Sequence, residues 1–122
     1  MKPKRNKYGI NLGVFGKAAR TIDGILFASK AEARYYAELK VRERMGEIQN
    51  IARQVPFDLR CGEIIIRTPT GRIMRYVADF SYDNLATCTT VFVDVKGFRD
   101  KVSMLKISIV EALYGIKIRI VK

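Results

Sequence analysis

The sequence predicts a protein of the α/β (α+β) class, in which one mixed β-sheet is flanked by helices. Two segments carry apolar side chains at helical spacing between capping residues. Several short runs rich in Val, Ile, Tyr and Phe lie between and after them and are typical of strands. The chain has 122 residues, a length that fits one domain with one modest core.

The first helix is expected from about Lys30 to Arg44. Ser29 precedes it as a good N-cap, and Gly46 lies near its end as a stop signal. At about 100° per residue, one side of this helix becomes apolar, with a carboxylate in the middle of it. That side consists of Glu32, Tyr35, Tyr36 and Leu39.

Strands are expected on both sides of this helix. A short extended piece covers residues 21–28, and four runs after the helix have strand character, at residues 51–59, 63–68, 72–82 and 90–96. The turn sequence Pro69-Thr70-Gly71 predicts that the second and third of these four runs form a hairpin.

A second helix is expected from about Ser103 to Tyr114, with Gly115 as its C-terminal cap. The evidence for this helix is that Leu105, Ile109, Ala112 and Leu113 recur at helical spacing. A last strand is expected at residues 116–121, where isoleucines alternate with Lys117 and Arg119.

The charge balance favours a polyanionic partner. Lys and Arg number 23 and Asp and Glu number 12, so the net charge is 23 − 12 = +11. Nucleic acid is the first candidate, and a basic structural protein such as a ribosomal component is the alternative. Residues 1–20 have the composition of a flexible basic N-terminal arm, and residues 21–122 are expected to form a single domain.

The residue types present restrict the chemistry. The chain has no histidine, which excludes Ser-His, Cys-His and other His-based catalysis. Cys61 and Cys88 form no Cys-x-x-Cys pair, so the usual zinc sites are excluded, and we expect two buried thiols, with a disulfide as the alternative. No run is apolar enough for a membrane span or a signal peptide, so a cytoplasmic location is expected.

Two aspartates and a lysine are the strongest candidates for a catalytic site. Asp94 and Lys96 stand two residues apart on a strand and therefore point to the same face; alone, they could be a plain ion pair. Asp79 lies in the apolar run Tyr-Val-Ala-Asp-Phe, where a lone carboxylate needs a cation or donors. If adjacent strands bring Asp79 and Asp94 together, Mg²⁺ suits their oxygen ligands.

Glu32 has two interpretations. Ser29-x-x-Glu32 matches a capping box, in which Glu32 bonds back to the amide of the N-cap residue. Glu32 also lies on the apolar side of its helix, from which it could reach the same metal cluster directly or through water.

The ordered set Glu32, Asp79 and Asp94-Val95-Lys96 resembles the signature of the PD-(D/E)XK nuclease superfamily. Over residues 20–121 the chain resembles small endonucleases of phages and prophages, among which are Holliday-junction resolvases. The resemblance rests on Phe-Ala-Ser-Lys-Ala-Glu-Ala-Arg-Tyr-Tyr, Tyr-Val-Ala-Asp-Phe, Val-Asp-Val-Lys-Gly and Gly-Ile-Lys-Ile. There are two departures: Ala78 replaces the Pro that often precedes the first Asp, and Val93 stands where an acid is expected.

The resemblance implies a restriction-endonuclease-like core in the order α-β-β-β-α-β and direct, metal-dependent hydrolysis of a phosphodiester. Asp79 and Asp94 would hold one or two Mg²⁺ ions, for which Mn²⁺ would substitute, and Glu32 would complete the cluster. Lys96 would orient the attacking water or neutralise developing charge. Gln54 on a neighbouring strand could assist, although an exposed polar residue is the simpler interpretation.

The expected function is a Mg²⁺-dependent DNA endonuclease, structure-selective for branched DNA such as Holliday junctions. Two symmetric cuts need two active sites, so a homodimer is expected. The alternatives are a restriction-like or transposon-end-type nuclease, or a basic nucleic-acid-binding protein without catalysis. The residues expected to contact DNA are Lys2, Lys4, Arg5, Lys7, Lys17, Arg20, Arg99 and Lys101.

Overall fold

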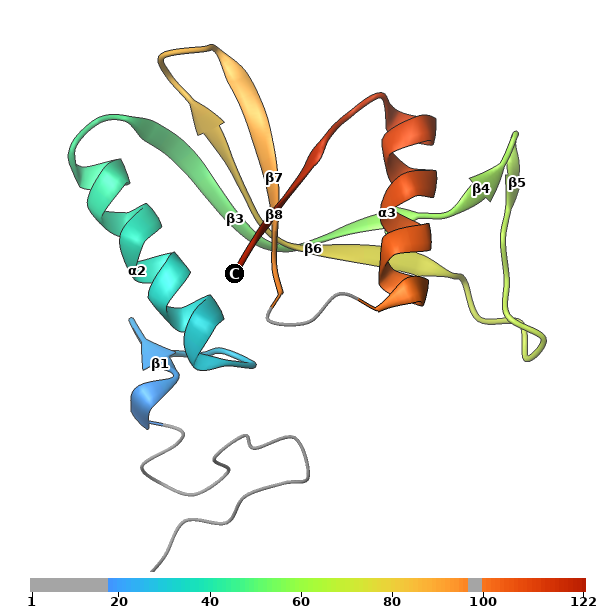
Figure 1. The fold of residues 1–122 in the computed structure, drawn as a ribbon, viewed down its shortest axis with the longest axis horizontal. Coiled ribbons are helices and arrows are strands. Elements are labelled where there is room, and N and C mark those ends of the chain that lie inside the picture. The colour runs from blue at the N-terminus through green and yellow to red at the C-terminus, as the bar shows by residue number, and fades with distance from the viewer. Residues whose placement is uncertain (1–17, 97–99) are drawn as a thin grey trace, which may run out of the picture. The chain divides into compact units, whose positions relative to one another are not determined.

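The computed structural model describes residues 18–96 and 100–122. Its contacts divide the chain into two compact units, Met1–Met45 and Gly46–Lys122, and each unit is described on its own. Both helices and sheet are present (Figure 1), which confirms the predicted α+β class. The predicted N-terminal arm, apart from its last residues, lies outside the described residues.

The first unit begins with a small hairpin where the sequence predicted one extended piece. Strands β1 (Thr21–Ile22) and β2 (Ile25–Leu26) pair antiparallel around Asp23 and Gly24. Asp23 and Gly24 have φ angles of 53° and 75°, which fits a turn with two left-handed residues. The dipeptide Asp23-Gly24 is itself a signal for a two-residue hairpin turn, which the prediction of one extended piece overlooked.

Helix α2 (Lys30–Arg44) follows the hairpin and has the predicted bounds. The backbone N–H of Glu32 donates to Ser29 Oγ at 3.1 Å, so Ser29 caps the helix as expected. The predicted apolar side is confirmed for Tyr36 and Leu39, which are buried together with Glu32 and Ala33. The Phe27 ring lies 5.0 Å from that of Tyr36, which joins the hairpin to the helix.

The second unit is built on a four-stranded sheet in the order β3-β6-β7-β8. Strands β3 (Ile48–Asp58), β6 (Arg75–Asn84) and β7 (Thr89–Val95) pair antiparallel. Strand β8 (Ile118–Val121) adds to β7 in parallel after helix α3, so the predicted mixed sheet is confirmed. The predicted strands at 51–59, 72–82, 90–96 and 116–121 correspond to these four, with ends shifted by up to three residues.

The strand predicted at residues 63–68 is wrong in extent. Within it, only Ile64–Ile65 (β5) is a strand, and it pairs with the unpredicted strand β4 (Arg60–Cys61) in a separate two-stranded sheet. Between residues 67 and 73 the predicted hairpin is reduced to one bridge, Arg67 with Ile73. Gly62, with a φ of 63°, makes the tight turn between β4 and β5 that the prediction missed.

Helix α3 (Lys101–Tyr114) packs on the sheet, and Gly115 caps it in the left-handed conformation as predicted. Of the residues at helical spacing, Leu105 is 62% exposed and Leu113 is 40% exposed, whereas Ile109 packs against the core. Ile107 and Val110 are buried in that core with Tyr76, Ala78 and Ile118. The spacing alone does not show which side is buried, since this helix is apolar on both sides.

Two further expectations are corrected or bounded. Cys61 and Cys88 are both free and exposed, whereas buried thiols were predicted. Both lie in tight turns or short ribbons, which offer no interior to bury them. None of the helices in the described part of the chain is long and apolar enough to cross a membrane.

Candidate functional site

Strands β6 and β7 part from each other at one end. Their ladder ends at Phe80 and Val93, although β6 begins five residues earlier at Arg75 and β7 continues to Val95. At this point Asp79 Oδ2 accepts a hydrogen bond of 2.8 Å from the backbone N–H of Val95. A side-chain carboxylate therefore replaces the backbone carbonyl that would continue the ladder. We call Tyr76, Asp79, Asp94 and Lys96 the fork.

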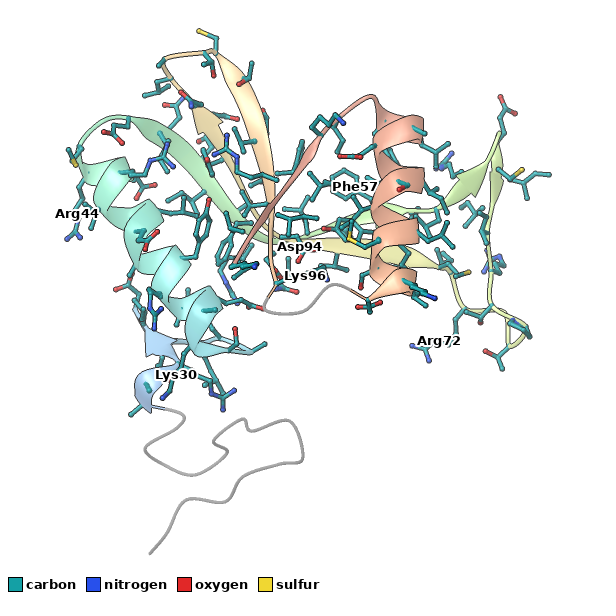
Figure 2. All side chains as sticks on the ribbon, viewed as in Figure 1. Lys30, Arg44, Phe57, Arg72, Asp94 and Lys96 are labelled. Carbon is teal, nitrogen blue, oxygen red and sulfur yellow. The ribbon has the colours of Figure 1, made fainter. Side chains whose placement is uncertain are left out.

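Asp94 is the most enclosed acid of the fork, with 4% of its surface exposed. Its Oδ2 accepts a hydrogen bond from the Tyr76 hydroxyl at 2.5 Å and lies 3.5 Å from Lys96 Nζ. Figure 2 shows Asp94 and Lys96 together at the end of β7. Oδ1 of Asp94 makes no hydrogen bond to any residue that the structure describes. Among the described residues, therefore, protein groups hold one carboxylate oxygen of Asp94 and leave the other without a hydrogen bond.

Lys96 carries the cation of the fork. Its side chain is 18% exposed, and its backbone N–H donates to the Val121 carbonyl at 2.8 Å. The parallel strand β8 therefore holds the backbone of Lys96 in place beyond the end of β7. The predicted pairing of Asp94 with Lys96 on one face is confirmed by the contact between their side chains.

Tyr76 is a member of the fork to which the sequence had assigned no role. Phe57 packs against it with ring centroids 6.3 Å apart and also contacts Phe92 and Tyr114. Burial, together with the hydrogen bond to Asp94, raises the pKa of the Tyr76 phenol well above its usual range. Tyr76 is therefore a permanent donor at any physiological pH. The signal for it was a phenol inside an apolar strand, because a buried tyrosine hydroxyl requires a partner.

Gln54 is placed by the sheet register on the strand next to Asp79. The pairs Arg53 with Phe80 and Val55 with Ala78 flank it, so it stands across from Asp79. Its φ of 51° is uncommon for a residue other than glycine, and its side chain is exposed. No hydrogen bond links Gln54 to the acids of the fork among the described residues, so its assisting role stays a prediction.

Glu32 lies on α2 in the first unit and is 9% exposed. Its backbone N–H makes the forward half of the capping box with Ser29. The two interpretations of its carboxylate therefore both remain, and a mutation that separates them is given below.

The residues predicted to contact DNA fall into three groups. Arg20 is buried and donates from its guanidinium to the carbonyls of Phe27 and Ala28, both at 3.2 Å. It therefore links the first hairpin to the segment before α2. Arg20 is thus part of the folded first unit, whereas the sequence had predicted a place in a flexible arm. Lys101 is exposed at the start of α3. The others lie outside the described residues: Lys2, Lys4, Arg5, Lys7, Lys17 and Arg99.

The donor set of the fork suits a hard divalent cation. Asp79 and Asp94 supply carboxylate oxygens, and Mg²⁺ in proteins is commonly held by one or two carboxylates with water completing its shell. Among residues 18–96 and 100–122, no three His, Cys, Asp or Glu side chains are grouped as a ready-made metal cluster. The protein groups at the fork thus fit a cation that keeps much of its water.

Fold and site together define a small α+β protein in which two aspartates and a lysine lie where two strands part. Residues 15–121 match the model of the family described as "Protein of unknown function (DUF1064)". The match covers most of the chain, which therefore belongs to this family. No curated protein and no solved structure matches the chain.

Proposed function

We propose that this protein is a metal-dependent nuclease that hydrolyses DNA phosphodiester bonds at the fork. One observation carries the proposal: Asp79 and Asp94 come from neighbouring strands at the point where these part, and Lys96 contacts Asp94. A purely structural ion pair would explain Asp94 and Lys96. It leaves unexplained why a second aspartate stands at the same end of the sheet.

The charge of the whole chain supports nucleic acid as the substrate. A net charge of +11 attracts a polyanion, yet the fork itself contains two carboxylates and one lysine. Carboxylates placed against phosphate repel it unless a cation lies between them. A protein that only binds nucleic acid gains nothing from such acids, whereas a metal-dependent hydrolase requires them.

Each residue of the fork has a distinct part in the proposed reaction. Asp94 would bind the metal through Oδ1 while Tyr76 and Lys96 hold Oδ2 in place. Asp79 would be the second ligand and keeps the two strands at the right separation through Val95. Lys96 would orient the attacking water or offset negative charge on the phosphate oxygens. A bound Mg²⁺ would lower the pKa of that water and polarise the phosphate.

Branched DNA is the proposed substrate, with Holliday junctions as the example. The described residues form two small compact units, which leave little room within them for an element that reads sequence. A homodimer belongs to the same proposal, because paired cuts across a junction need two sites. Light scattering with and without a four-way junction measures that stoichiometry.

The experiment that tests the proposal offers the protein a four-way junction, a linear duplex and single strands, with Mg²⁺ and then with EDTA. We expect cleavage that EDTA abolishes and that excess linear duplex inhibits only weakly. With Ca²⁺ the junction should be bound but poorly cut, since Ca²⁺ accepts the same oxygens at longer, looser distances. No cleavage of any of these with Mg²⁺ or Mn²⁺ would contradict the proposal. Equal competition by linear duplex would leave a general nuclease.

A further inference from the structure

A basic excursion leaves the four-stranded sheet between β3 and β6, and we call residues 59–74 the basic ribbon. Figure 1 shows it as a projection that carries β4 and β5 beyond α3. Its base is fixed by three backbone hydrogen bonds that link Leu59, Ile66 and Met74, at 2.9 to 3.0 Å. Leu59 is 1% exposed in the core, and Ile66 and Met74 pack against that core. The ribbon is therefore anchored as a folded part of the second unit.

The pairing register assigns Arg60 and Arg67 to the outer face of the ribbon. Leu59 and Ile66 face the core, and neighbouring residues along a strand point to opposite faces. Arg60 and Arg67 therefore lie on the other face, where Arg60 pairs with Ile65 and Arg67 with Ile73. Arg60, Arg67 and Arg72 are all exposed, and Figure 2 shows Arg72 extending from the turn of the ribbon.

These cations are not offset by nearby acids. The ribbon holds three arginines and one acid, Glu63 at its tip, so its net charge is 3 − 1 = +2. The side chains of Arg60 and Arg72 make no ion pair with any described residue, and Arg67 donates only to the Gly71 carbonyl at 3.0 Å. At the base, Arg75 contacts Asp58 at 2.6 Å and neutralises the acid nearest to the ribbon.

We propose that the basic ribbon binds the phosphate backbone of duplex nucleic acid next to the fork. This inference rests on the proposed function and assigns a binding surface to it. A two-stranded ribbon is narrow enough to lie in or along a groove of a duplex. Arginines on its outer face would contact phosphate oxygens, which fixes the position of the duplex without reading its sequence.

Strand β6 joins the ribbon to the fork. It begins at Arg75, immediately after the ribbon, and carries Tyr76 and Asp79. Four residues of strand between Arg75 and Asp79 span about 13 Å at ~3.3 Å per residue. At ~3.4 Å per nucleotide along a strand, the ribbon would begin to contact the duplex about four nucleotides from the cleaved bond. The ribbon would therefore hold flanking duplex.

The test compares two triple variants with the same net charge. Arg60→Gln, Arg67→Gln and Arg72→Gln remove the cations of the ribbon. Lys30→Gln, Arg34→Gln and Arg44→Gln remove three exposed cations of α2 as the matched control. Binding to a duplex of several helical turns is measured in EDTA over a salt series, and thermal melting checks that both variants fold.

We expect the ribbon variant to reduce the slope of log affinity against log salt by about three, since each phosphate contact contributes ~0.9. The α2 variant should change the slope by less than about one contact. An unchanged slope for the ribbon variant, or an equal fall in both variants, would overturn the inference.

This experiment separates the inference from the proposed nuclease activity. The binding measurement uses no metal and no cleavage. If the wild type cleaves DNA but the ribbon variant has an unaltered salt slope, only the role of the ribbon in binding is refuted. A reduced slope with no cleavage under any condition refutes only the hydrolysis. Wild-type protein that binds no duplex refutes both.

Discussion

Both ends of the β6–β7 pair carry aspartates, but the surroundings of these aspartates differ. At the hairpin end, Asp83 accepts hydrogen bonds from Asn50 and Thr90, both at 2.8 Å, beside an unbroken ladder. At the other end, the ladder stops, and Asp79 and Asp94 occupy the gap with Tyr76 and Lys96. The first end holds one acid that two side chains donate to. The second holds two acids on neighbouring strands where the ladder ends, and this is the place where the proposed metal would bind.

The largest difference between the two ends should appear in cleavage. Asp79→Asn and Asp94→Asn keep an acceptor oxygen for Val95 and Tyr76 but remove the charge that would bind the proposed metal. We expect each to reduce cleavage by at least ~10³-fold, the equivalent of several kcal/mol of charge stabilisation. Asp83→Asn is the matched control and should cleave like the wild type. Single-turnover rates of cleavage of a four-way junction are measured for all three variants. Similar losses in all three would show that the two ends of the β6–β7 pair do not differ in their role in cleavage.

Lys96→Met tests the cation of the fork. The change leaves both carboxylates in place, so metal and DNA binding should persist while the water and phosphate lose their positive neighbour. We expect a loss of about 10²- to 10³-fold in the cleavage rate. Lys117→Met, at an exposed position before β8, should have little effect. A fully active Lys96→Met would leave Lys96 as a simple partner of Asp94.

Glu32→Gln decides between the cap and the ligand. A Gln can still complete the capping box, so melting should be unchanged, while cleavage should fall about a hundred-fold if Glu32 helps to hold the metal and its water. Ser29→Ala is the opposite control: it should destabilise α2 by about 1 kcal/mol and leave cleavage intact. Normal cleavage by Glu32→Gln would assign Glu32 to the cap alone.

Tyr76→Phe tests the support of Asp94 by its neighbour. Loss of the hydroxyl frees Oδ2 and loosens the carboxylate, and we expect about a tenfold loss of cleavage that higher Mg²⁺ partly restores. Tyr82→Phe alters another buried tyrosine of the same strand and should cleave normally. Because the pKa of Tyr76 is raised, no titration of its phenol should appear in the pH profile of the wild type.

The smallest effect concerns acid stability at the hairpin end. Hydrogen bonds from Asn50 and Thr90 hold the pKa of Asp83 below its ordinary value of 3.8. A lowered folded-state pKa contributes stability above the unfolded pKa, which is lost as the pH falls through the folded pKa. The melting difference between wild type and Asp83→Asn should therefore be constant near neutrality and shrink below about pH 4. A difference that grows with acid would contradict this sign.

Local features were predictable from the sequence. The bounds of α2 follow from Ser29 at one end, and the shared face of Asp94 and Lys96 follows from strand alternation. Features that depend on register or competing faces were not. The Tyr76 hydroxyl meets Asp94 because of how β6 and β7 part, which no single strand reveals. Helix α3 buries Ile107 and Val110 although Leu105 and Leu113 match the periodicity equally well.

The most direct test of the central claim needs no substrate. Thermal melting with increasing Mg²⁺ or Mn²⁺ measures cation binding to the folded protein, since a ligand that binds only the native state raises Tm. The account predicts that wild type and Asp83→Asn gain stability equally with metal, and that Asp79→Asn and Asp94→Asn do not. Equal stabilisation of all four proteins, or no stabilisation of the wild type at saturating metal, would contradict a metal site at the fork.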